Sequence, residues 1–473
     1  MKTPKLPKYF LIFKQTQAPK TMIKIPYGIS DFRTLIKSGY FFVDKTPFIE
    51  QLDQLDSRYH FLLRPRRFGK SLFVSMLKYY YGMEYKEEFQ ELFGHLHIGK
   101  KPTEKANAYR VLYFEFSRID TSTPQSTFDG FLDNVKLGVE DFIERYGLFT
   151  EGKKKQILNK QMPSMVLNAL FAAYKPQGDF PIYILIDEYD HFANEILAFH
   201  FTSFSDMVSR NGFVRKFYEA IKTATGDNTV EQLFVTGVTP ITLDSLTSGF
   251  NIRTDLSQDF RFNEAMGFTE GDVKDVIEGI CEGYPCDQDK MMEDLRGWYN
   301  GYRFSEKAGR KIYNPDMLLY FANQFKADGN YPKNMIDHNI ASDYGKIKAL
   351  FNLQNPEANY EVLEELMKGE SLSYNLTTEF SFERSFTRDD FASLLYYMGF
   401  LTQDSDGMGL TLLQVPNHVV WKLYVDFITE QLSLRNDLNL EMWDARKAVT
   451  ALAQYNNPKP LFDKLQETLK KLS

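Results

Sequence analysis

Cysteine, histidine and long apolar runs are scarce in this chain. Cys281 and Cys286 are the only 2 cysteines among 473 residues, which argues against a disulfide framework and for a reducing compartment. The 7 histidines are scattered and offer no metal-ligand cluster. Because no run of about 18 apolar residues occurs, we expect no membrane-spanning helix and a cytoplasmic location.

A secretion signal and a strong basic charge are also missing. Residues 1–24 hold several lysines and an apolar patch from Phe10 to Phe13, which is far shorter than the core of a signal peptide. We expect this segment to be a flexible tail. The net charge of −7 is spread along the chain, so no global basic field attracts nucleic acid.

The apolar segments that are present predict an α/β domain followed by helical regions. Runs typical of buried strands occur at residues 59–65, 109–116, 182–188 and 230–238, with helix-like segments between them. Continuous apolar strands separated by helices indicate a mostly parallel sheet covered on both faces. Later segments are mainly helical, and one expected strand at 410–415 suits the wing of a winged-helix-like module.

These patterns divide the chain into four expected parts, since 473 residues suit more than one domain. They are the tail 1–24, an α/β domain 25–266, a helical lid 267–312 and a mainly helical C-terminal domain 313–473. Thr269 is expected to cap the first lid helix.

A phosphate-binding loop is predicted within the stretch 61–73, FLLRPRRFGKSLF. Lys70 is expected to reach the β- and γ-phosphates, Ser71 to give its hydroxyl to Mg²⁺, and Gly69 to allow close approach of the phosphates. A Gly-Lys-Ser or Gly-Lys-Thr tripeptide arises by chance in roughly one chain in four of this length. Its position between a predicted strand and a predicted helix therefore carries the prediction.

Arginine stands at the start of this loop, where glycine is usual. The residues expected to contact the nucleotide are Arg64, Pro65, Arg66, Arg67, Phe68, Gly69, Lys70, Ser71 and Leu72. Positive charge near the transferring phosphoryl group stabilises the transition state, so at least one loop arginine is expected to point at phosphate. The alternative is that the arginines are solvated or paired with acids. Further candidates for such a cation are Arg253, Arg261 and Arg303.

Two acids end the third apolar strand, where α/β sheets place their ligands. Asp187 is expected to hold Mg²⁺ and Glu188 to polarise the attacking water. The alternative is that both acids cap the next helix. Asp190 is expected to be a surface or capping residue, and His191 a structural one.

The fourth apolar strand ends in a threonine. We expect Thr236 to sense the γ-phosphate, and Thr239 is a second candidate for this role. A strand-end threonine is also common without any function.

Seven stretches occur in this order: IPYGISDFRTLIKSGYFFVDKT, LLRPRRFGKSLF, YILIDEYD, FVTGVTPIT, GFTEGDV, WYNGYRF with the following YNP, and VPNHVVWKLY. With them the chain resembles the AAA-ATPase-like family of prokaryotic P-loop proteins over about residues 25–424. The resemblance implies ATP and Mg²⁺ as ligands, and RPRRFGKS as the family's own form of the loop. It implies Lys70 and Ser71 at phosphate and metal, with Asp187 and Glu188 as the acidic pair.

The resemblance also suggests that Asp44-Lys45-Thr46 lines the nucleotide site; the alternative is that Asp44 or Thr46 caps a helix. Family members often carry a C-terminal PD-(D/E)XK nuclease-like domain, whose metal site needs strand-borne acids and a lysine. Asp463, Glu467 and Lys470 instead follow a helical pattern. We therefore expect the nuclease-like domain to be absent.

Three functions remain compatible with these features. The favoured one is a Mg-dependent ATPase that works as a nucleotide-driven switch or motor. The second is a nucleotide-gated scaffold with little turnover. The third is the ATPase module of a DNA-processing system, where DNA rests on family analogy alone. The sequence leaves open a protein client or homo-oligomer, the source of any catalytic arginine, and the choice between ATP and GTP.

Overall fold

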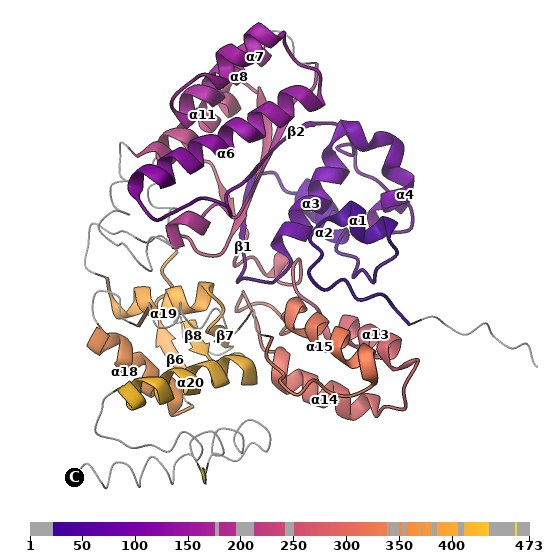
Figure 1. Cartoon of the computed structure of the whole chain (residues 1–473), viewed down its shortest axis with the longest axis vertical. Helices are drawn as coiled ribbons and strands as arrows, with labels where there is room; N and C mark the ends of the chain where they lie inside the picture. The colour runs from indigo at the N-terminus through magenta and orange to yellow at the C-terminus, as the bar shows by residue number, and fades with distance from the viewer. Residues whose placement is uncertain are drawn as a thin grey trace, which may run out of the picture.

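The fold is known from a computed structural model, which describes residues 22–175, 179–194, 212–241, 250–337, 340, 350–351, 356–369, 371–378, 380, 386–404, 411–434 and 459–460. A sheet with its covering helices, a helical group and a C-terminal group follow one another (Figure 1). Most of the expected tail lies outside the described residues, as do Asp463, Glu467 and Lys470.

Five parallel strands form the central sheet, in the order β2-β3-β4-β1-β5. They are β1 Tyr59–Leu63, β2 Arg110–Glu115, β3 Ile182–Asp187, β4 Val230–Gly237 and β5 Thr254–Asp255. The first four are the predicted apolar runs, and their burial agrees with a parallel sheet covered on both faces. Strand β5 has only 2 residues, too few to show an apolar pattern.

Adjacent residues of β2 show how the two faces are covered, because side chains alternate along a strand. The ring of Phe114 meets Phe217 at 5.6 Å on one face, whereas Lys78 lies 5.6 Å above the ring of Tyr113 on the other. The first face carries α6 Pro124–Arg145, α8 Pro163–Tyr174 and α11 Phe213–Gly226, with α7 Glu151–Leu158 beside them.

The second face carries α3 Lys70–Tyr81, which packs on three strands. Around it lie α1 Phe32–Lys37, α2 Pro47–Asp53, the 3-10 helix Met83–Glu88, α4 Phe89–Phe93 and α5 His97–Lys100 (Figure 1). Gly69 caps the start of α3 in a left-handed conformation and Gly82 caps its end. The helix predicted after the loop is therefore confirmed, and it ends at Gly82.

Three helices follow the sheet domain: α13 Glu270–Cys281, α14 Gln288–Tyr299 and α15 Pro315–Asp328. The first two lie in the segment expected to be a lid. Thr269 and Asp272 form a capping box at the start of α13, so the predicted cap is confirmed. Helix α15 packs against α13 and α14. We therefore propose that the lid extends beyond residue 312 and includes α15.

A disulfide joins Cys281 to Cys286 in the lid. One bridge is not the disulfide framework that the cysteine count argues against, but it is an observation against the expected reducing compartment. The turn after α13 brings their Cα atoms to 6.1 Å, within the range that a disulfide spans, although they are only 5 residues apart.

The C-terminal group combines helices with a small antiparallel sheet, in the order β6-β8-β7. Its described elements are α18 Pro356–Met367, β6 Leu372–Tyr374, α19 Arg388–Tyr397, β7 Thr402–Asp404, β8 Thr411–Gln414 and α20 His418–Leu434. The strand predicted at 410–415 is confirmed as β8. The expectation of one strand in this region is wrong, because β6 and β7 both pair with β8.

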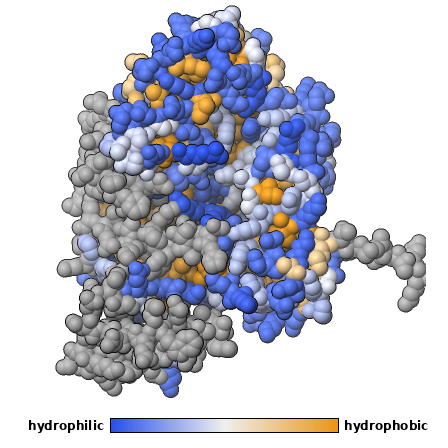
Figure 2. Space-filling model, viewed as in Figure 1, coloured by the Kyte–Doolittle hydropathy of each residue, from blue (hydrophilic) through white to orange (hydrophobic). Residues whose placement is uncertain are grey.

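The surface shows mixed polarity. The face in Figure 2 is mainly hydrophilic, with small apolar patches over the helices at the top. Exposed large apolar side chains such as Leu137 and Phe260 come from separate elements. No helix in the described part of the chain is long and apolar enough to cross a membrane.

Arg64 joins the central sheet to the lid side of the molecule. Its side chain is 1% exposed, and its guanidinium donates to the carbonyls of Leu63 at 2.7 Å, Ser257 at 2.9 Å and Phe262 at 2.7 Å. The guanidinium carbon also lies 4.2 Å from the ring centre of Phe304. Burial lowers the pKa of Arg64 to about 10, so the side chain stays charged at neutral pH. The expectation that Arg64 contacts the nucleotide is corrected, because these carbonyls hold its side chain.

The C-terminal group and the lid both contact the loop directly. Gly399 has φ 85°, and a Cβ atom there would lie 2.7 Å from Cβ of Pro65. Phe68 packs edge-on against Tyr302 at 4.8 Å and Phe304 at 5.4 Å. The loop is therefore held from behind by segments far away in the sequence.

We expect Arg64→Ala to lower the free energy of unfolding by about 3 kcal/mol, because three buried carbonyls lose their donor and a cavity remains. Denaturant titration measures this change. Arg310→Ala is the matched control, since the Arg310 side chain is 72% exposed and its loss should cost less than about 0.5 kcal/mol. Equal stability of the two variants would contradict the structural role of Arg64.

Candidate functional site

The loop between β1 and α3 turns on two left-handed residues. Gly69 has φ 85° and Arg67 has φ 66°. A residue other than glycine is uncommon in this region of backbone space. The first-turn N–H groups of α3 have no partner within the helix, so this turn presents an anion site. A loop poor in glycine reaches this geometry through Arg67 and Gly69.

The side chain of Lys70 turns back onto this loop. Its side chain is 5% exposed, and Nζ donates to the carbonyl of Pro65 at 3.1 Å. Burial lowers the pKa of Lys70, although the carboxylates of Glu188 and Asp187 act in the opposite direction. A cation is thus held next to the two predicted acids.

Asp187 ends β3 and is 2% exposed. One carboxylate oxygen accepts the backbone N–H of Glu188 at 3.0 Å, and the nearby Ser71 side chain acts to lower the pKa of the Asp187 carboxyl. The structure therefore brings the two predicted metal ligands together. Mg²⁺ usually takes one or two protein oxygens and completes its shell with phosphate and water, so a hydroxyl and a carboxylate fit it.

Glu188 follows in a left-handed conformation, with φ 51°. Its carboxylate lies 3.2 Å from Nδ1 of His191, and its side chain is 30% exposed. Burial acts to raise the pKa of Glu188, but the His191 hydrogen bond and the Lys70 charge outweigh it and bring the pKa to about 2. Glu188 is thus held as a carboxylate.

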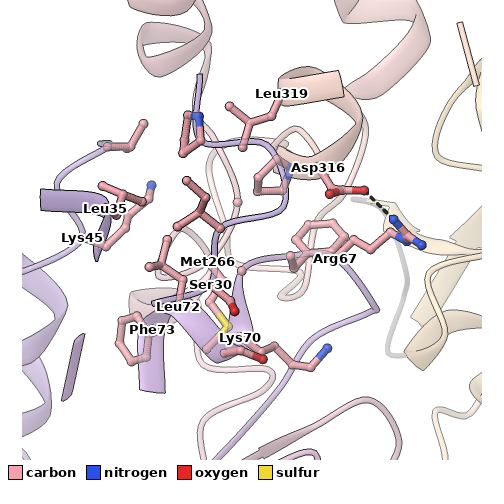
Figure 3. A pocket seen from close by; sticks show the side chains of 18 of the residues that line it. Ser30, Leu35, Lys45, Arg67, Lys70, Leu72, Phe73, Met266, Asp316 and Leu319 are labelled. Atoms are coloured by element: carbon pink, nitrogen blue, oxygen red, sulfur yellow. Dashed lines mark hydrogen bonds and ion pairs between the residues drawn. The ribbon is translucent and has the colours of Figure 1, made fainter. Parts of the chain in front are cut away.

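A cavity of about 280 Å³ opens beside these residues (Figure 3). The loop and α3 line one side, and the lid and the N-terminal segment line the others. Lys70 and Glu188 mark its polar end, and the apolar lining includes Ile29, Leu35, Phe41, Val43, Met266 and Leu319. A cavity that is mostly apolar with a few converging charges is typical of a small-molecule site.

Lys45 lines this cavity, as the resemblance implies. Asp44 and Thr46 are not among the residues that line it, and Thr46 stands at the N-cap position of α2 without a side-chain cap hydrogen bond. The N–H and hydroxyl of Thr46 donate to Asp44 at 2.9 and 2.6 Å, and the Thr46 hydroxyl accepts the N–H of Ile98 at 3.1 Å. These two residues therefore fix the entry to α2.

Two ion pairs cross from the sheet domain to the lid. Lys45 lies 3.4 Å from Asp272 in α13, and Arg67 lies 2.8 Å from Asp316 in α15. In Figure 3 the Arg67–Asp316 pair and Lys45 lie on opposite sides of the cavity. In both pairs the cation comes from the sheet domain and the acid from the first turn of a lid helix.

The other predicted arginines point elsewhere. Arg303 donates to Asp404 at 3.3 Å, and Arg261 pairs with Asp259 at 2.5 Å. Arg253 lies 6.0 Å from the ring centre of Phe61. The expectation that one of these three closes on the nucleotide is therefore not supported by their contacts.

Arg66 differs from its neighbours in the loop, because its charge acts on both Lys70 and Glu188. Arg66 itself is not among the residues that line the cavity.

The hydroxyl groups of the two strand-end threonines form hydrogen bonds within the fold. The hydroxyl of Thr236 donates to the carbonyl of Leu62 at 2.7 Å, within the sheet. The hydroxyl of Thr239 donates to Asp190 at 2.9 Å and to Asn194 at 2.6 Å. We therefore withdraw Thr236 and Thr239 as phosphate sensors.

Asp190 holds the end of β4. It is 1% exposed and accepts the N–H groups of Val238 at 3.0 Å and Thr239 at 2.6 Å. A capping role is thus confirmed and a surface position is wrong. A Cβ on Gly237 would lie 2.2 Å from Asp190 Oδ1, so only glycine allows this approach.

Two residues near the acids have roles that the sequence analysis does not assign. His191 contacts Glu188, and the signal for this is their separation of three residues across a turn. Glu115 pairs in register with Asp187 and its charge helps to raise the pKa of that residue. Its position at the end of a neighbouring parallel strand is the available signal.

Residues 26–247 match the family model described as "Predicted AAA-ATPase". This segment belongs to the AAA-ATPase-like family. The match includes the loop and both acids of the AAA-ATPase segment, whereas the lid helices and the C-terminal group lie outside it.

Two further proteins resemble the chain. A protein of Azotobacter chroococcum, named "Uncharacterized protein in vnfD 5'region", is 30% identical over 321 residues, which are 63% of this chain. The chain spans about half of that relative, 52% of its length. A solved Walker-type ATPase of Pyrococcus abyssi is 10% identical, with a TM-score of 0.45 over 80% of this chain and 94% of the other.

The buried carboxylate of Asp187 makes the stability of the AAA-ATPase segment depend on pH. Burial raises its pKa to about 6 from the ordinary value of 3.8, and the charge of Glu188 adds to this rise. The folded state therefore holds the proton more tightly than the unfolded state does. The contribution of Asp187 to the free energy of unfolding is therefore lowest above pH 6, and it increases as the pH falls toward 3.8.

We expect Asp187→Asn to stabilise the nucleotide-free protein by about 3 kcal/mol at pH 7.5, because the variant buries no charge. The gain should fall to about half at pH 5, where folded Asp187 is mostly protonated in the parent. Denaturant titrations of both proteins at the two pH values measure it. A variant without any gain at pH 7.5 would show that the Asp187 charge costs no stability.

Proposed function

We propose that the chain binds Mg-ATP in the cavity between the loop and the lid, and that it hydrolyses the bound nucleotide. The observation behind this proposal is that Lys70, Ser71 and Glu188 line that cavity, and that Asp187 at the end of β3 interacts with all three. A cation, a hydroxyl and two carboxylates are the groups that phosphoryl transfer to water requires.

Each group has a proposed part in the reaction. The N–H groups at the start of α3 and the ammonium of Lys70 bind phosphate oxygens. Bound Mg²⁺, held by Ser71 and Asp187, supplies charge to the phosphates. Glu188 accepts a hydrogen bond from the attacking water. The apolar part of the cavity receives the base.

Arg66 is the loop arginine that we propose to stabilise the transferring phosphoryl group. Arg64 is held by backbone carbonyls and Arg67 by Asp316, whereas the charge of Arg66 reaches Lys70 and Glu188. An arginine in the same chain needs no second subunit to complete the site.

The ion pairs between the sheet domain and the lid suggest a role beyond hydrolysis. Because Lys45 and Arg67 both line the cavity and pair with lid acids, a bound nucleotide competes with those acids for the same cations. We propose a nucleotide-driven switch, whose client, homo-oligomer or DNA partner is open. A scaffold with little turnover is the second candidate, favoured by the low pKa of Glu188, which weakens it as a base.

We propose the cytoplasm as the compartment because the chain has only 2 cysteines. The Cys281–Cys286 disulfide is the observation against this assignment.

Lys70→Ala should weaken Mg-ATP binding at least about 100-fold, since the phosphates lose a buried cation. Glu188→Gln should keep binding within about threefold and lose turnover at least about 100-fold. Calorimetry and phosphate release measure the two effects. Tight ATP binding by Lys70→Ala would show that the loop is not the phosphate site. Absence of turnover in a parent that binds ATP would favour the scaffold.

Arg66→Ala should lower kcat about 1,000-fold, with binding of Mg-ATP changed less than about tenfold, because the charge develops in the transition state. Arg261→Ala is the control, since the side chain of Arg261 is 50% exposed and pairs with Asp259. Unchanged kcat in Arg66→Ala would leave the role to an arginine from another subunit, and mixing with Lys70→Ala protein tests that source.

A further inference from the structure

Glu188 is held in a backbone conformation that glutamate rarely adopts. Its φ of 51° lies in the left-handed region, which costs a residue other than glycine on the order of 1 kcal/mol or more. Such a conformation persists only where neighbouring contacts enforce it. The Glu188 N–H donates to Asp187 Oδ1 at 3.0 Å, and its carbonyl accepts the N–H of His191 at 3.1 Å.

His191 holds the side chain of Glu188 as well as its backbone. Nδ1 of the imidazole lies 3.2 Å from Oε2 of Glu188, and the His191 side chain is 18% exposed. One residue thus binds the carbonyl and the carboxylate of Glu188. Two attachment points fix the direction of a side chain better than one.

The turn that carries His191 is itself anchored to β4. Tyr189 donates through its N–H to the carbonyl of Thr236 at 3.1 Å and through its hydroxyl to Thr239 at 2.6 Å. Asp190 accepts two N–H groups beyond β4, as described above. His191 therefore stands on a fixed base, and the position of its ring follows from the sheet.

Lys70 also attracts the Glu188 carboxylate, although no ion pair joins these two described side chains. The charge of the Lys70 ammonium lowers the pKa of Glu188, and burial strengthens such an attraction. A carboxylate drawn onto Lys70 would neutralise the cation needed at phosphate and would lose its hold on water. The imidazole provides a second donor that keeps the carboxylate away from Lys70.

We propose that His191 is a positioning residue, which directs the Glu188 carboxylate toward the attacking water. The inference rests on the proposed hydrolysis. With its proton on Nδ1, the imidazole donates to Oε2 and leaves Oε1 to accept from water. The water oxygen bonds to the γ-phosphorus as the bond to the bridging oxygen breaks. That electron pair leaves with ADP, and the proton of the water passes by way of Glu188 to the phosphate product.

His191→Ala and His191→Asn test this role, because an asparagine amide can place a donor near the position of Nδ1. We expect His191→Ala to lower kcat about 10- to 100-fold, since a misplaced base costs about this much. KM and the affinity for Mg-ATP should change less than about threefold. His191→Asn should recover at least about a third of the parent kcat, which a purely structural histidine would not predict.

His95→Ala is the matched control, because His95 is exposed and should leave kcat unchanged. Thermal unfolding of each variant shows whether its fold is intact. Turnover retained by folded His191→Ala, while Glu188→Gln is inactive, would overturn this inference alone. So would an equal loss in the alanine and asparagine variants. A parent that binds Mg-ATP without turnover would overturn the proposed hydrolysis, and this inference with it.

Discussion

The buried guanidinium of Arg64 is the contact on which the arrangement around the loop depends. A charged group removed from water is tolerated when polar partners surround it, and three carbonyls and an aromatic face do so here. Those partners come from β1, from residues 257–262 and from Phe304. One side chain thus fixes the loop, the segment after β5 and the lid relative to one another. Arg64 at the start of the loop therefore stabilises the fold, and any contact with phosphate is left to other residues.

The neighbouring acids at the end of β3 are tuned in opposite directions. Burial raises the pKa of Asp187 to about 6, whereas for Glu188 the His191 and Lys70 contacts overcome burial and give about 2. Two adjacent carboxyl groups with separated pKa values are suited to separate tasks. In the proposed reaction, a cation at Asp187 would relieve the cost of its buried charge, and Glu188 would orient water more than it removes a proton. Loose transition states of phosphoryl transfer need mainly such positioning.

The sequence predicts what local patterns encode. Strands β1 to β4, helix α3 and the cap at Thr269 follow from apolar spacing and capping residues. The grouping of Lys70, Ser71, Asp187 and Glu188 follows from parallel strands that end at one edge. Arg64 is different, because two of its three acceptors are backbone carbonyls about 200 residues away, and any residue type supplies a carbonyl. Thr236 is misjudged for a related reason, since its position at a strand end says nothing of the direction of its hydroxyl. The role of His191 depends on the left-handed turn at Glu188, which residue identity does not reveal.

Gly399 has a mechanical consequence. Because it carries no side chain, the turn after α19 rests directly on the ring of Pro65, with no intervening layer to absorb displacement. A ring with fixed φ transmits a push better than a flexible chain does. A displacement of Pro65 would therefore be passed directly to the C-terminal group, about 330 residues further along the chain. The loop and the turn after α19 are joined mechanically by this direct contact.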